Sequence, residues 1–192
     1  MSERPANRAY LSLGSNIEPE KYLPAAVREL APLGRIAATS SVWESAPFGA
    51  SAVSDQSANT EKTLADKPPV PPRTAPNFLN AAVLLETDLS PAELYQAVAT
   101  IEERLGRVRD PHDKNAPRTI DIDLSLFNRD VFECRGHRVP DPDLMKRAFV
   151  AVPLAELDPA YVHPLVERRL ADVAAELRAR SDLIERPDVN LR

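Results

Sequence analysis

The order of strand-like and helix-like segments is the feature that most constrains the fold of this chain. Alternating apolar residues and runs of β-branched residues predict strands in four segments, over residues 8–16 (with a turn at Gly14), 34–45, 77–87 and 117–127. Apolar residues at helical spacing predict helices over residues 19–34 and 90–106. The order β-α-β-β-α-β is the ferredoxin-like pattern of an antiparallel sheet with helices packed on one face. We therefore predict an α+β domain in which the opposite face of the sheet is free to carry a site.

End signals support the two helices. Ser90 and Glu93 form a capping-box pattern, with Pro91 at the first helical position and Gly106 at the end. In the first helix, Pro24 is expected in the first turn, where its missing N–H costs no hydrogen bond. Three further elements are expected beyond the last strand: a short strand near Val131, short Pro-interrupted helices over residues 139–159 and an amphipathic helix over residues 165–180.

Residues 50–76 differ in character from the rest of the chain. This segment has no aromatic residue, five prolines and many small polar residues, so it cannot bury enough apolar area to offset the entropy of ordering. We predict a flexible, Pro-rich loop insert within a single domain that spans residues 1–192. Its PPVPP run fits either a stiff spacer or a polyproline II ligand for a partner.

Composition argues against several classes of protein, although a local basic patch remains compatible with it. The net charge of −5 argues against a nucleic-acid binder, because phosphate contacts need a basic surface. The single cysteine, Cys134, cannot form an intrachain disulfide, which fits a reducing compartment. The N-terminus has no secretory h-region, and no run reaches the ~18 apolar residues of a membrane span. We expect a cytoplasmic monomer with no membrane or nucleic-acid partner.

The stretch PRTIDIDLSLF, residues 117–127, carries the strongest chemical signal. As a strand, it points four apolar side chains to one face: Ile120, Ile122, Leu124 and Leu126. Asp121 and Asp123 then share the other face, with Cα atoms about 7 Å apart. Two ionised carboxylates at this spacing repel each other, and a divalent cation between them would relieve the repulsion.

Cationic side chains lead directly into this strand. They are Arg104, Arg107, Arg109, Lys114 and Arg118. Alternate-position carboxylates suit Mg²⁺, and arginines grip phosphate oxygens, so the combination favours metal-assisted phosphoryl chemistry. The same residues would also fit a solvated face of ion pairs that contribute little to stability. The chain has neither the P-loop sequence G-x-x-x-x-G-K-[ST] nor the H-R-D motif of protein kinases.

Six segments in order carry a resemblance to a known family. They are AYLSLGSNI, SSVWESAPFG, NFLNAAVLLET, IEERLGRVR, PRTIDIDL and RAFVAVPLAEL. Together they resemble the 6-hydroxymethyl-7,8-dihydropterin pyrophosphokinases of folate biosynthesis, over residues 8–164 apart from the insert. The PRT-IDID segment is the most specific of the six.

The resemblance implies that the pterin hydroxymethyl oxygen attacks the β-phosphorus of ATP and that AMP leaves. It implies two Mg²⁺ ions held by Asp121 and Asp123, and a catalytic set of Arg107, Arg109, Asp121 and Asp123. Four residues match ATP-contacting positions: Glu102, Arg107, Arg118 and Arg147. Six match pterin-binding positions: Phe78 and Phe149 as the two walls, Asn80 at the ring edge, and Ser45, Ala46 and Phe48 around it. Without the resemblance, Phe78 and Phe149 would be interpreted as core residues and Glu102 as an ordinary surface residue of a helix.

This chain departs from the family pattern at three places. Asp141-Pro142 stands where the family often has His-Pro, residues 110–116 lack the usual aromatic residue and glycine, and the insert lengthens a loop that the family closes over the pterin. Two other functions remain open: a paralogue that binds pterin or nucleotide without turnover, and an RNA-binding ferredoxin-like domain. The second would need exposed aromatics in an RNP1-like strand, and no such stretch occurs in the sequence.

Overall fold

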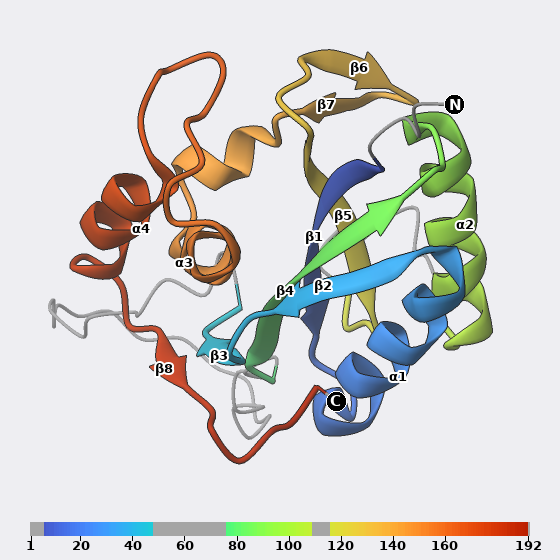
Figure 1. Ribbon diagram of the computed structural model, residues 1–192. Helices are drawn as coiled ribbons and strands as arrows, with labels where there is room; N and C mark the ends of the chain where they lie inside the picture. The colour runs from blue at the N-terminus through green and yellow to red at the C-terminus, as the bar shows by residue number, and fades with distance from the viewer. Residues whose placement is uncertain (1–5, 48–75, 109–115, 192) are drawn as a thin grey trace, which may run out of the picture.

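The computed structural model of the protein describes residues 6–47, 76–108 and 116–191. Apart from Pro76, the predicted insert lies outside the described residues. The main sheet contains β1 (Asn7–Ser15), β2 (Arg35–Thr39), β3 (Trp43–Ser45), β4 (Phe78–Thr87), β5 (Asp121–Phe127) and β8 (Ile184–Glu185). Its strands follow the order β5-β1-β4-β3-β8. The strand β3 pairs with the N-terminal part of β4, and β2 pairs with the C-terminal part (Figure 1). All of these pairings are antiparallel, which confirms the predicted class of mixed helix and antiparallel sheet.

Helices cover both faces of the sheet, and not one face as expected. On one side lie α1 (Pro19–Leu30) and α2 (Pro91–Arg104); on the other lies α3 (Ala148–Leu157), with α4 (Leu170–Arg178) packed on it (Figure 1). Two apolar clusters result, one between the sheet and α1–α2 and one between the sheet and α3–α4. Because α3 covers only part of the second face, the remainder of that face is left open.

The pairing of β1 with β5 contains a bulge that reverses the phase of β5. Leu11 lies opposite Leu124, but Tyr10 lies opposite Leu126, so Ser125 is the extra residue. Leu126 therefore packs in the α3–α4 cluster, and the prediction that it shares a face with Leu124 was wrong. A strict two-residue alternation fails at a bulge, because the extra residue moves every later side chain to the other face.

The predicted start of α2 is confirmed, but the predicted position of Pro24 in the first turn of α1 was wrong. The Ser90–Glu93 capping box forms, since the backbone N–H of Ser90 donates to the Glu93 carboxylate at 2.8 Å. The helix α1 begins at Pro19, so Pro24 lies in its interior and not in its first turn. After α1 and the turn η1 (Ala31–Leu33), Gly34 allows a close approach of the chain, because a Cβ there would lie 2.1 Å from the carbonyl oxygen of Glu86.

The C-terminal half begins with a hairpin and a 3-10 turn. The hairpin is β6 (Phe132–Cys134) with β7 (His137–Val139), and the turn is η2 (Pro142–Met145), which leads into α3. The short strand expected near Val131 corresponds to β6. After α4, the chain returns to the sheet as β8, and Leu191 is buried in the α1–α2 cluster. Within the described ranges, no helix is long and apolar enough to cross a membrane.

Candidate functional site

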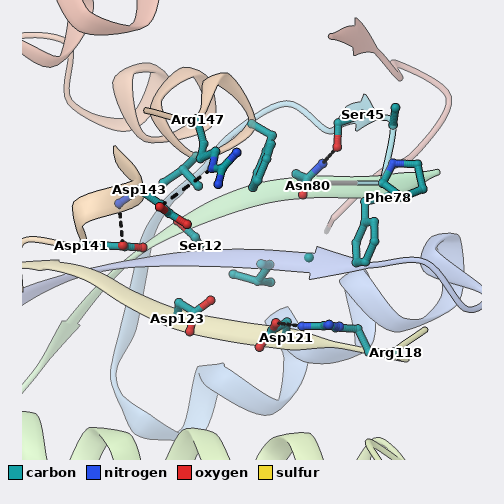
Figure 2. A pocket seen from close by; sticks show the side chains of 16 residues that line it. Ser12, Ser45, Phe78, Asn80, Arg118, Asp121, Asp123, Asp141, Asp143 and Arg147 are labelled. Atoms are coloured by element: carbon teal, nitrogen blue, oxygen red, sulfur yellow. Dashed lines mark hydrogen bonds and ion pairs between the residues drawn. The ribbon is translucent and has the colours of Figure 1, made fainter. Parts of the chain in front are cut away.

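A cavity of about 260 Å³ opens on the uncovered part of the second face (Figure 2). The strand register explains its floor. Gly14 lies opposite Asn80 on β4 and opposite Asp121 on β5, so these three residues form one row across neighbouring strands. Ser12 lies opposite Asp123 in the next row on the same face. Side chains from β3, η2 and α3 supply the walls of the cavity.

Asp121 is held by two arginines at one end of the cavity. Arg118 Nη1 donates to its Oδ2 at 2.6 Å, and Arg107 Nη1 donates to its Oδ1. Arg107 also pairs with Glu102, whose carboxylate accepts the backbone N–H of Ile122 at 2.9 Å. Burial alone would lower the pKa of Arg107, but the Asp121 and Glu102 carboxylates outweigh it and raise the pKa above its ordinary value. The three elements α2, β5 and the segment before β5 are therefore joined by a single charged network.

Asp123 has a different environment. Its carboxylate faces the cavity, and none of the described residues is seen to donate a hydrogen bond to it. The surrounding protein removes water from the carboxylate, and Asp121 and Asp141 add negative potential, so the pKa of Asp123 rises to about 7. Ionising Asp123 therefore costs more free energy than ionising an exposed carboxyl, and a cation bound beside it would favour the ionised form.

The donor set fits Mg²⁺. Within the described ranges, no group of three or more His, Cys, Asp or Glu side chains could hold a metal. Mg²⁺ does not need such a group, because proteins usually bind it through one or two carboxylates, with waters and substrate phosphates completing the shell. Asp121 and Asp123 provide two carboxylates on one face of β5, and the uncompensated charge of Asp123 favours a cation there. Each Asp121 oxygen has a second lone pair beyond the one that its arginine occupies.

The η2–α3 corner brings a second acidic pair to the cavity. Asp141 accepts the backbone N–H of Asp143 at 2.9 Å, and Asp143 lies 3.9 Å from Arg147 Nε (Figure 2). Burial raises the pKa of Asp141, and the hydrogen bond from Asp143 partly opposes this. Arg147 stands immediately before α3 and is directed into the cavity from that side.

Aromatic and amide groups line the other end. Phe78 comes from β4 and Phe149 from α3, and both are half-buried residues that line the cavity, although Phe149 also packs against the α3–α4 cluster. Asn80 is only 5% exposed, and its Nδ2 donates to the carbonyl oxygen of Trp43 at 3.2 Å and to Ser45 Oγ at 3.0 Å (Figure 2). The amide plane of Asn80 is thus fixed by β3. A slot with aromatic walls and a fixed amide suits a flat heteroaromatic ligand that has hydrogen-bonding edges.

A second cavity of about 420 Å³ adjoins the first and shares Asp123, Asp141 and Asp143 with it. Its outer wall is formed by Tyr95 from α2 and His137 from β7, whose rings stack with centroids 5.3 Å apart. The hydroxyl of Tyr95 is buried, and no hydrogen-bond partner for it is found among the described residues.

The structure brings together most of the residues that the sequence predicts for the site. Nine line the first cavity: Ser45, Ala46, Phe78, Asn80, Arg118, Asp121, Asp123, Arg147 and Phe149. Glu102 and Arg107 lie behind Asp121; Glu102 is 3% exposed, so its interpretation as an ordinary surface residue was wrong. Phe48 and Arg109 lie outside the described residues.

Sequence reasoning missed several residues of the two cavities. Ser12, Gly14 and Asp143 line the first cavity, and Tyr95 and His137 line the second. The polar phase of Ser12 within the alternating first strand was a usable signal. It could not be interpreted without the register that sets Ser12 opposite Asp123.

Comparisons with known proteins show which family this chain matches. A family model described as 7,8-dihydro-6-hydroxymethylpterin-pyrophosphokinase (HPPK) matches residues 10–159. The 2-amino-4-hydroxy-6-hydroxymethyldihydropteridine pyrophosphokinase of Bacillus subtilis is 38% identical over 154 residues, which cover 79% of this chain and 78% of the relative. The protein of the same name from Pseudomonas aeruginosa is 34% identical over 155 residues, 79% of this chain and 81% of the relative.

Solved structures show the same fold. A Plasmodium falciparum HPPK-DHPS crystal structure with pteroate superposes with a TM-score of 0.65 at 15% sequence identity. The match covers 94% of this chain but 44% of that chain, so this chain spans less than half of it. The likeness therefore concerns the fold of the matched part.

Proposed function

The chain belongs to the 7,8-dihydro-6-hydroxymethylpterin-pyrophosphokinase family, and from that premise we propose that it transfers pyrophosphate from ATP to 6-hydroxymethyl-7,8-dihydropterin in folate biosynthesis. One observation carries the proposal: a single cavity joins an aromatic slot with a fixed amide to a pair of carboxylates surrounded by arginines. The reaction needs these two environments side by side, since it joins a flat pterin to a chain of phosphates.

The aromatic end is proposed to bind the pterin. Phe78 and Phe149 would contact the two faces of the ring, and Asn80 would hydrogen-bond its edge through the amide atoms that β3 leaves available. Ser45 and Ala46 line the same end, and Phe48 is assigned there by the family resemblance alone. With the ring fixed, the hydroxymethyl group would be directed toward β5, where the phosphates are to be bound.

The charged end is proposed to bind the phosphates of ATP. Asp121 and Asp123 would hold Mg²⁺, two ions by the resemblance, and the metal would supply positive charge to the phosphate oxygens. Arg118 and Arg147 line this end and can contact phosphate oxygens directly. Arg107 and, by the resemblance, Arg109 would stabilise the charge that develops as the hydroxymethyl oxygen bonds to the β-phosphorus and AMP departs.

Glu102 is proposed to act through Arg107. It lines neither cavity, and its carboxylate both pairs with Arg107 and accepts the N–H of Ile122. This arrangement would keep Arg107 directed at Asp121 while the phosphates bind. The direct contact of Glu102 with ATP that the resemblance implies stays a prediction.

The second cavity is proposed to bind the adenine base. It shares Asp123 with the phosphate end, so a nucleotide whose phosphates lie on β5 can extend into it. Tyr95 and His137 supply flat rings on which the base would stack.

A product assay tests the proposed function. The protein is incubated with ATP, Mg²⁺ and 6-hydroxymethyl-7,8-dihydropterin, and the nucleotides are separated by chromatography. We expect AMP and the pterin pyrophosphate in equal amounts, without ADP above background. ADP as the main nucleotide would contradict the proposal, because it marks the transfer of one phosphoryl group.

Asp141 gives some support to a second candidate, a pterin- or nucleotide-binding protein without turnover. It stands where the family often has histidine, and it adds a carboxylate beside the phosphate end. Pterin binding without release of AMP would favour this candidate.

We further propose that the protein acts in the cytoplasm as a monomer. Size-exclusion chromatography with light scattering would test the oligomeric state.

A further inference from the structure

The C-terminal segment, residues 184–191, begins with β8, which pairs with β3. The strand β3 in turn accepts the hydrogen bonds of the Asn80 side-chain amide. The strand β3 pairs with β4 on one edge and with β8 on the other, where Trp43 lies opposite Glu185. Immediately after β8, the backbone N–H of Arg186 donates to the carbonyl oxygen of Val42 at 2.8 Å. The end of the chain then leads to Leu191, which is 4% exposed in the α1–α2 cluster. The segment is therefore anchored at both of its ends (Figure 1).

Arg186 is the charged centre of this segment. Its Nη1 donates to Glu44 at 2.9 Å, and its Nε and Nη2 bind Asp188 in a bidentate pair at 2.9 and 2.8 Å. Arg186 Nη2 also reaches Glu20 of α1 at 3.5 Å. Asp188 fixes the plane of the guanidinium group, so the remaining nitrogen is held toward Glu44.

Glu44 connects Arg186 to the residue that precedes β4. Its other carboxylate oxygen accepts Asn77 Nδ2 at 2.7 Å, one residue before Phe78. Hydrogen bonds from Asn77 and then from Arg186 lower the pKa of Glu44, so the carboxylate stays ionised. The side chains of Arg186 and Glu44 are 26% and 24% exposed, so their pair is less screened by water than most surface pairs.

The strand held in this way determines how Asn80 is directed. Both recorded bonds of Asn80 Nδ2 go to β3, one to the Trp43 carbonyl oxygen and one to Ser45 Oγ. A shift of β3 along β4 would turn the Asn80 amide and move Ser45 at the same time. The two groups that face the pterin edge therefore depend on the position of a three-residue strand.

We propose that Arg186 is a positioning residue for the pterin site: by binding Glu44 it fixes β3, and β3 fixes the amide of Asn80. This inference rests on the proposed function, because it assigns the slot to the pterin. Arg186 touches neither cavity, so its effect should be confined to pterin binding. The ATP end is built on β5, α2 and η2, none of which contacts Arg186 through a recorded bond.

The test compares Arg186→Ala, Arg186→Lys and the control Arg169→Ala. Arg169 forms a bidentate pair with Asp172 on the exposed start of α4, so its removal changes net charge equally without touching β3. We expect Arg186→Ala to raise the KM for the pterin about tenfold, with kcat and the KM for ATP unchanged. Arg186→Lys should recover part of the loss, since a lysine can still bind Glu44, and the control should match the wild type.

Binding and folding readouts separate the outcomes. Pterin affinity is measured in parallel by the fluorescence of the pterin, without ATP, and thermal melting is recorded for each variant. A lower melting temperature with an unchanged KM and affinity for the pterin would overturn the inference, because it marks a purely structural role. If Arg186→Ala fails to fold, Glu44→Gln replaces it: a neutral amide keeps the Asn77 contact, and we expect the same selective loss of pterin affinity.

The wild-type control distinguishes this inference from the proposed function. Wild-type protein that binds the pterin but releases no AMP contradicts the proposed reaction and leaves the affinity test of Arg186 decisive. Wild-type protein that does not bind the pterin at all overturns both. If the wild type turns over normally and Arg186→Ala binds the pterin as tightly as the wild type, only the positioning role of Arg186 is overturned.

Discussion

Arg107 and Asp121 form an ion pair although they lie fourteen positions apart in the chain. Arg118 binds the other oxygen of the same carboxylate, so Asp121 is compensated by two guanidinium groups. Asp123, on the same face of β5, has no such donor among the described residues, and its pKa rises to about 7. Two neighbouring carboxylates that would both bind Mg²⁺ thus have different electrostatic environments.

The two carboxylates should respond differently to neutralisation. Asp121→Asn removes a partner of two arginines and should destabilise the apo protein by about 1.5–3 kcal/mol. Asp123→Asn removes an uncompensated charge and should raise the melting temperature. Both variants should abolish turnover if both residues hold Mg²⁺. Thermal melting and AMP release are measured together, with the exposed Asp172→Asn as control; a near-wild-type rate in either variant would exclude a metal role for that residue.

The raised pKa of Asp123 predicts a pH dependence with a definite sign. A carboxyl whose pKa is about 7 in the folded protein and about 3.9 in the unfolded chain binds its proton more tightly when folded. Its contribution favours folding at low pH and is lost as the pH rises through the window between these values. The difference in melting temperature between Asp123→Asn and wild type should therefore grow from pH 5 to pH 8.

Mg²⁺ should reverse this trend in the wild type. A metal ligand must be deprotonated, so added Mg²⁺ should stabilise the wild type more at pH 8 than at pH 6. Removal of the ion with EDTA should return the melting temperature to its apo value. If Mg²⁺ stabilises Asp123→Asn as much as the wild type, Asp123 is not a ligand in the absence of ATP.

Glu102 offers a test of positioning behind the site. Glu102→Gln keeps the acceptor for the Ile122 N–H but loses the ion pair with Arg107. Because Asp121 is then the one ion-pair partner left to Arg107 among the described residues, we expect kcat to fall about tenfold with little change in the KM for the pterin. Steady-state kinetics decides this, with Glu103→Gln on the exposed side of the same helix as control. Equal kinetics of the two variants would contradict the role of Glu102.

Local pattern was sufficient to predict the elements and the central chemistry. The alternation in residues 120–124 put Asp121 and Asp123 on one face, and the capping box of α2 formed as expected. These features depend on neighbours within a few residues, which the sequence displays directly. The interpretation of Leu126 failed because a bulge is a property of two paired strands, and neither strand alone indicates it.

Features that depend on distant pairing could not be predicted. The two residues of β8 are too few to display a period, and their pairing with β3 joins segments about 140 positions apart. The packing of η2 and α3 on the second face of the sheet likewise depends on the path of the chain after β7, and it brings Asp143 to the cavity beside Arg147, which the family resemblance had already assigned to the ATP site. Local sequence pattern therefore predicted the two carboxylates on β5, but it did not predict the residues of η2 and α3 that lie across the cavity from them.

Shortening the insert should have a small effect on the stability of the protein. Its composition indicates that it adds little to the core, and loop entropy varies slowly with length. Replacing residues 51–74 with a short Gly/Ser linker should change the free energy of unfolding by no more than about 1 kcal/mol. Denaturant unfolding of the two proteins measures this. A shortened protein that cannot fold would mean that the insert is a structural part of the domain.

The second cavity predicts which variants change ATP binding alone. His137→Ala removes one of the two stacked rings, so we expect a rise of about fivefold in the KM for ATP while the KM for the pterin stays unchanged. Tyr95→Phe keeps the ring and removes a buried hydroxyl for which the described residues provide no hydrogen-bond partner, so the variant should bind ATP nearly as well and melt at a slightly higher temperature. Steady-state kinetics with ATP varied at saturating pterin measures both. An unchanged KM for ATP in His137→Ala would mean that the base does not stack on this wall, whereas a large loss in Tyr95→Phe would mean that the base hydrogen-bonds the hydroxyl.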